Sequence, residues 1–82
     1  MNASAIVRKI MSEAGVSQKK IADQIGLNSQ QAVFNMLNAK LGMRIDNFIK
    51  IMNALGYEVI VRNKDSNESI IVDVDRVIIN EE

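Results

Sequence analysis

The residues best suited to chemistry are three amide side chains in one short polar stretch. Gln30, Gln31 and Asn35 each carry a hydrogen-bond donor and an acceptor on one rigid group. This arrangement matches the donor and acceptor that adenine presents in the major groove of DNA. Phe34 lies beside them and can contact a thymine methyl group, or it can pack in the core. The stretch therefore predicts contact with DNA bases, whereas the alternative for the amides is an ordinary solvent-facing surface.

Two short helices and a tight turn must position these side chains. Ser17 is a good N-cap for a helix over residues 18–25, and Gly26 favours the left-handed conformation that ends it. Ala22 precedes Gly26 by four residues, and a small side chain there lets two helices cross closely. A third helix is expected over residues 30–38. Such a helix-turn-helix can place its second helix in the major groove.

Two further helices are expected on either side of this pair. The first spans residues 3–14 and ends before Gly15, which suits the left-handed position after a helix. The fourth spans residues 45–55, where apolar residues recur at helical spacing. The stripe that we expect this helix to bury consists of Ile45, Phe48, Ile49, Met52 and Leu55.

The last third of the chain has the composition of strands. Residues 57–62 and 70–74 are rich in β-branched side chains, and a polar turn separates them. The expected fold is therefore mainly α, with a four-helix helix-turn-helix domain over residues 1–56. A C-terminal β-hairpin or strand pair used for dimerisation is expected over residues 57–82.

The order of helices and turn residues resembles the lambda-repressor-like, XRE-type helix-turn-helix family. The resemblance covers about residues 4–57 and rests on Ser17-Gln18, Ala22, Gly26-Leu27, Gln30-Gln31-Ala32-Val33 and Ala54-Leu55-Gly56-Tyr57. It implies a transcriptional regulator, usually a repressor, that binds symmetric operators. The chain departs from the family by having Asn38 near the place of an acidic residue, and by nearly lacking an N-terminal arm. Contact with the minor groove is therefore not expected.

Contacts to DNA phosphates are expected from cations and helix ends around the third helix. Ser17 and Gln18 lie at a helix N-terminus, whose free amides favour a phosphate, although Ser17 can serve as a cap alone. The lysines have the alternative of simple solvation. The full expected set is Ser17, Gln18, Lys19, Ser29, Asn38, Lys40 and Arg44.

The charge of the chain is unevenly distributed, although its net value is zero. Residues 1–64 carry nine Lys and Arg against four Asp and Glu, a net charge of +5. Residues 65–82 carry one Arg against six Asp and Glu, a net charge of −5. Ordinary variation of solvated surfaces also produces such asymmetry. The positive charge of residues 1–64 is therefore compatible with nucleic-acid binding but does not require it.

The predicted hairpin, over residues 57–80, carries apolar side chains on both faces, and we expect another protein surface to cover one of them. A lone two-stranded hairpin is marginally stable and leaves its edges open. We therefore expect residues 57–80 to join two chains by strand pairing, and a homodimer also suits two half-sites on DNA. The alternative is an intramolecular hairpin packed on the helices of a monomer. The expected dimer contacts are Tyr57, Val59, Val61, Ile70, Val72, Val74, Val77 and Ile79.

The chain lacks the residue types that several classes of function require. The chain has no Cys, no His and no glycine-rich loop, so enzyme activity, a metal or a cofactor is not expected. No segment approaches the roughly 18 apolar residues of a membrane span. The start of the chain also lacks the pattern of a signal peptide. We therefore expect a cytoplasmic protein with no membrane partner.

The rival hypothesis is a protein-interaction module. An antitoxin combines both roles, because its DNA-binding part represses while its other segment, here the C-terminal strands, binds a toxin or co-regulator. The amide-rich face of the third helix favours double-stranded DNA, since a protein-binding face would be more apolar. Phe34 is the residue of this face that favours a protein partner.

Overall fold

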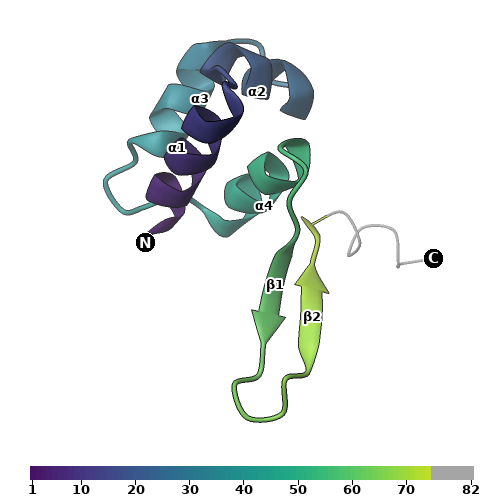
Figure 1. The fold of residues 1–82 in the computed structure, drawn as a ribbon. Coiled ribbons are helices and arrows are strands. Elements are labelled where there is room, and N and C mark those ends of the chain that lie inside the picture. The colour runs from purple at the N-terminus through teal and green to yellow at the C-terminus, as the bar shows by residue number, and fades with distance from the viewer. Residues whose placement is uncertain (75–82) are drawn as a thin grey trace, which may run out of the picture.

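The computed structural model describes residues 1–74, which form a helical domain and a projecting hairpin (Figure 1). Within residues 1–74 the fold is mainly helical, with four helices and a two-stranded antiparallel sheet, as the sequence predicts. The expected dimer contacts Val77 and Ile79 lie outside the described residues. The elements are α1 (Ala3–Ala14), α2 (Gln18–Ile25), α3 (Gln30–Leu37), α4 (Ile45–Ala54), β1 (Val59–Arg62) and β2 (Ser69–Val72).

The turn between α2 and α3 begins as the sequence predicts. The hydroxyl oxygen of Ser17 accepts a hydrogen bond from the backbone N–H of Lys20 at 3.1 Å, so Ser17 caps α2. Gly26 ends α2 with a φ of +82°, in the left-handed region. The next N–H, that of Leu27, donates to the carbonyl of Ala22 at 2.8 Å. This bond closes the C-terminal cap of α2, and residues 26–29 connect α2 to α3.

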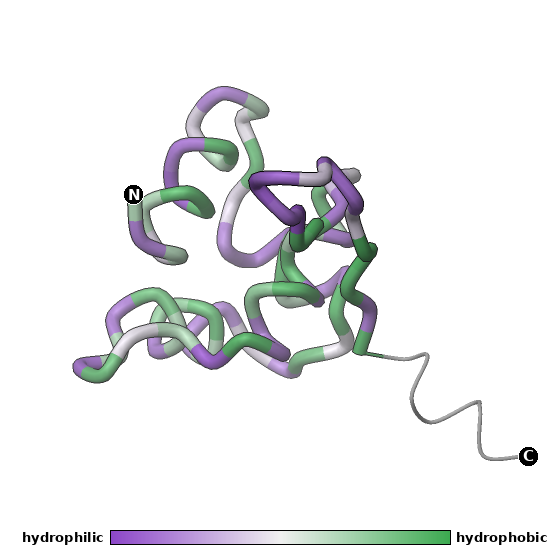
Figure 2. Tube along the Cα trace, turned by 90° about the horizontal axis from the view of Figure 1, so that it is seen from below, coloured by the Kyte–Doolittle hydropathy of each residue, from purple (hydrophilic) through white to green (hydrophobic). Residues whose placement is uncertain are grey.

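The core lies where the helices meet. Buried side chains come from every helix, and the cluster consists of Val7, Ile21, Ala22, Val33, Leu37, Ile51 and Met52. Figure 2 shows hydrophobic and hydrophilic stretches alternating along the helical part of the chain, as expected for helices that bury one face. None of the described helices is long and apolar enough to cross a membrane.

The buried face of α4 differs from the predicted stripe. Ile51, which the predicted stripe omits, is 0% exposed, whereas Ile45 is 65% exposed. α4 contacts both α1 and α2, so it buries a wider face than a single stripe. Ile45 is the first residue of α4 and follows an exposed loop, so it lies at the edge of this packing.

The hairpin is antiparallel and pairs within one chain. Its register places Val59 opposite Val72, Ile60 opposite Ile71, Val61 opposite Ile70 and Arg62 opposite Ser69. The turn is ordered by Asn63, whose side-chain oxygen accepts hydrogen bonds from the N–H groups of Asp65 at 2.8 Å and Ser66 at 3.1 Å. This turn is nearest the viewer in Figure 2 and is hydrophilic.

Both strands are shorter than predicted at the end nearest the helices. The predicted first strand begins at Tyr57, but β1 begins at Val59. The reason is that the N–H of Tyr57 donates to the carbonyl of Met52 at 2.8 Å and belongs to the C-terminal cap of α4. The second strand ends at Val72, two residues before the predicted Val74.

Candidate nucleic-acid interface

One face of α3 is exposed and carries the predicted base-contacting residues. Gln30, Gln31, Phe34 and Asn35 are exposed on this face, which we call the amide face. The other side of α3 holds the helix in the core, through buried side chains of Val33 and Leu37. Phe34 is 47% exposed, so it does not pack as a core residue. The structure therefore brings the predicted base-contacting residues together on one surface.

Two residues of the amide face are joined by a hydrogen bond. The side-chain nitrogen of Gln31 donates to the side-chain oxygen of Asn35 at 3.1 Å, one helical turn away. This bond leaves the oxygen of Gln31 free to accept and the nitrogen of Asn35 free to donate. The amide face thus offers neighbouring donor and acceptor groups in a restrained arrangement, which suits recognition of base edges.

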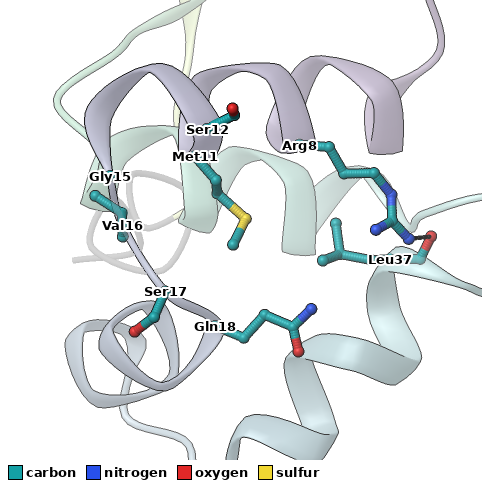
Figure 3. A pocket seen from close by; sticks show the side chains of 8 residues that line it. All are labelled: Arg8, Met11, Ser12, Gly15, Val16, Ser17, Gln18 and Leu37. Atoms are coloured by element: carbon teal, nitrogen blue, oxygen red, sulfur yellow. Dashed lines mark hydrogen bonds between the residues drawn. The ribbon is translucent and has the colours of Figure 1, made fainter.

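Three of the predicted phosphate contacts lie at the N-terminal ends of α2 and α3. Ser17 is exposed, and its hydroxyl oxygen is engaged in the N-cap of α2. Gln18 is half-buried, and its side chain points from the start of α2 toward α3 (Figure 3). Ser29 precedes α3 but forms no side-chain cap bond there, so its hydroxyl is not used by the helix.

Two of the predicted phosphate-binding cations have acidic neighbours. Lys19 lies 3.9 Å from a carboxylate oxygen of Asp23, and Arg44 lies 3.1 Å from one of Asp46. The hydrogen bond from Arg44 lowers the pKa of Asp46, and the same bond raises the pKa of Arg44. The Lys19 pair is long and exposed and therefore weak, whereas Arg44 donates two hydrogen bonds of 3.1 Å to the half-buried Asp46. Among the described residues, Lys40 forms no ion pair.

Arg8 is a residue at this interface that the sequence analysis did not identify. Its guanidinium nitrogen Nη2 donates to the side-chain oxygen of Asn38 at 3.0 Å, and it lies 3.5 Å from the carbonyl oxygen of Leu37. Asn38 in turn donates to the carbonyl of Phe34 at 2.8 Å. Arg8 thereby ties α1 to the C-terminal end of α3. No local pattern signals this role, because Arg8 and Asn38 are 30 residues apart.

Asn38 was predicted as a phosphate contact, but both ends of its amide have partners within the protein. Its oxygen accepts from Arg8, and its nitrogen donates to the carbonyl of Phe34. Asn38 therefore links α1 to α3 in this structure. Lys40 and Arg44 remain the exposed cations in the segment that follows α3.

The hairpin presents apolar side chains on both faces. Because paired residues share a face, Val61 and Ile70 lie on one side, and Ile60 and Ile71 lie on the other. Ile70 is 69% exposed and Ile71 is 58% exposed. Of the predicted dimer contacts, Val61 and Ile70 near the turn of the hairpin are exposed, and so is Tyr57. Val59, Val72 and Val74, at the other end, are half-buried.

Strand pairing within the chain changes what a second chain can contact. β1 pairs with β2 of the same chain, so a partner can reach only the outer edges and the exposed faces. The hairpin extends away from the helices instead of folding back on them (Figure 1). Val59 is the hairpin residue that packs against the helical core. The strands therefore pair within one chain, as the intramolecular alternative has it, but only the end of the hairpin near Val59 packs on the helices.

Comparison of this chain with protein-family models, with curated proteins and with solved structures finds no match. Within residues 1–74, no group of three acidic side chains gathers in a way that could hold a metal ion.

Proposed function

We propose that this chain is a sequence-specific, non-enzymatic DNA-binding protein that regulates transcription in the cytoplasm. It acts as a homodimer on a two-fold symmetric operator, with α3 in the major groove of each half-site. The observation that carries this proposal is the amide face, where Gln30, Gln31 and Asn35 are exposed while the opposite side of α3 is buried. The resemblance to lambda-repressor-like proteins supports repression as the direction of regulation.

The surroundings of α3 support this proposal. Ser17 and Gln18 lie at the start of α2, as a helix that crosses the DNA backbone requires. Lys40 and Arg44 follow α3 and are exposed, which supports a role for them in binding phosphates beside the groove. The acidic part of the chain begins at Asp65, in the hairpin turn, which points away from the helices (Figure 1).

Selection from a pool of random duplexes tests the proposal directly. We expect the wild-type protein to enrich a two-fold motif, since each subunit of a symmetric dimer contacts one half-site. Gln31→Ala removes the amide donor and acceptor that we expect to contact a base. The variant should lose its base preference at one position of the motif, and its affinity for the wild-type motif should fall by about 10- to 100-fold. Gln24→Ala is the matched control, because Gln24 is an exposed glutamine of α2 outside the amide face. Absence of any enriched motif would contradict sequence-specific binding.

A second candidate function is a module that binds another protein, as an antitoxin does. The observation that favours it is the exposed face of Ile60 and Ile71, which lies opposite the predicted dimer face. A dimer that covers the face of Val61 and Ile70 leaves this second apolar face open. Raising the salt concentration separates the two functions, because DNA binding should weaken steeply while apolar protein binding should not.

A further inference from the structure

A cleft of about 440 Å³ lies between α1, the start of α2 and the end of α3 (Figure 3). We propose that this cleft binds a small amphipathic carboxylate, and that the bound carboxylate competes with DNA. The binding site is inferred from the cleft itself, whereas the competition rests on the DNA-binding function proposed above.

The floor of the cleft is apolar and fits the body of a small ligand. Met11 and Val16 are half-buried, and Leu37 is buried in the core. The side chain of Met11 points into the middle of the space between the helices (Figure 3). The volume lies in the range of small-molecule sites, which are mostly apolar with a few polar groups for orientation.

Arg8 supplies a positive charge at one end of the cleft. Arg8 forms no ion pair within residues 1–74, and its hydrogen bonds to Leu37 and Asn38 both come from the nitrogen Nη2. Its other guanidinium nitrogens keep their donors, and the planar fork of arginine binds a carboxylate with two parallel hydrogen bonds. The charge of Arg8 therefore favours an anionic ligand, and the apolar floor favours an anion that carries an apolar chain.

The same chemistry argues against an isolated phosphate as the occupant. A phosphate would engage Arg8 but would leave the apolar surfaces of Met11 and Val16 uncovered. A carboxylate attached to an apolar chain contacts both parts of the site, because the charged group reaches Arg8 while the chain covers Met11 and Val16.

The position of the cleft connects its occupancy to DNA binding. Ser17 and Gln18 line the cleft and are also proposed phosphate contacts. Arg8 lines the cleft and holds the end of α3 through Asn38. A ligand in the cleft therefore lies against Ser17 and Gln18, so the ligand and the DNA backbone compete for the same surface at the start of α2.

Octanoate is a suitable probe of the site, and octanol is its uncharged counterpart. We expect octanoate added to ¹⁵N-labelled protein to produce saturable NMR shifts in residues 8–18 and at Leu37. Octanol should bind at least about tenfold more weakly, because it cannot form the charged hydrogen bonds with Arg8. Shifts confined to the exposed apolar hairpin, or equal binding of the alcohol, would overturn the proposal. Equal shifts with inorganic phosphate would also overturn it.

Two variants test the residues of the cleft separately. Arg8→Met should weaken octanoate binding by about tenfold or more, whereas Lys9→Met, the adjacent cation paired with Glu13, should not. Ser12→Phe places a bulky ring at an exposed position that lines the cleft, so it should abolish binding while leaving Arg8 in place. Unchanged octanoate binding in either Arg8→Met or Ser12→Phe would show that the ligand lies elsewhere.

Competition is measured by the anisotropy of a labelled operator. At an octanoate concentration ten times its own Kd, mutually exclusive binding should raise the apparent Kd for DNA by about tenfold. An unchanged Kd for DNA would overturn the competition but leave the binding site. If no operator is bound even without octanoate, the proposed function fails, while the NMR titration still decides whether the cleft binds carboxylates.

Discussion

At the scale of single residues, Arg8 and Asn38 connect helices that are distant in sequence. Their hydrogen bond is 3.0 Å long and exposed to solvent, so its contribution to stability is moderate. A double-mutant cycle with Arg8→Met and Asn38→Ala should give a coupling free energy of about 0.5 to 1 kcal/mol in urea unfolding. Strict additivity of the two substitutions would show that the two side chains do not interact in solution.

Two isoleucines of α4 provide a matched test of the packing. Ile51→Ala should lower the free energy of unfolding by about 2 to 5 kcal/mol, because it opens a cavity around a fully buried side chain. Ile45→Ala makes the same chemical change in the same helix at a mostly exposed position, so its cost should stay below about 0.5 kcal/mol. Equal costs in chemical denaturation would contradict the observed orientation of α4.

At the scale of elements, Gly26 controls how α3 follows α2. A Cβ atom at Gly26 would meet nothing within 4 Å, so Gly26→Ala tests the backbone conformation alone. We expect it to destabilise the protein by about 1 to 2 kcal/mol, since alanine resists the left-handed region. Gly26→Asn should cost less, because asparagine tolerates that region better. Urea unfolding measures both variants, and an Asn variant as unstable as the Ala variant would count against this explanation.

At the scale of the whole molecule, we propose that the hairpin joins two copies of the chain. Its apolar faces project from the helices, and such surfaces are usually covered by a partner. We expect Ile70→Lys to dissociate the dimer, because it places a charge in the centre of the apolar contact. The change should be visible as a shift from dimer to monomer in sedimentation equilibrium.

Two control variants test which face of the hairpin forms the proposed dimer contact. Lys64→Ala alters the exposed turn and should leave the dimer intact. Ile71→Lys alters the opposite face, so it should have a smaller effect than Ile70→Lys if the face of Val61 and Ile70 is the contact. A wild-type protein that remains monomeric at several hundred micromolar would contradict dimerisation through the hairpin.

The sequence by itself determined the local structure of this protein. Helix periodicity, the Ser17 cap and the left-handed Gly26 were sufficient to predict α1 to α4 to within one residue at each end. These features depend on interactions within about one helical turn, so a single stretch of sequence contains all of their causes. The exposed amide face of α3 follows for the same reason, because its spacing separates it from Val33 and Leu37.

Only the tertiary structure decided how the elements meet. The link between Arg8 and Asn38, the burial of Ile51 and the projection of the hairpin depend on groups that are far apart in the chain. The late start of β1 arises because the cap of α4 uses the N–H of Tyr57. Packing between elements sets each of these features, since burial and long-range hydrogen bonds depend on which surfaces come together. The cleft beside Arg8 has the same origin, because it exists only where α1, α2 and α3 converge.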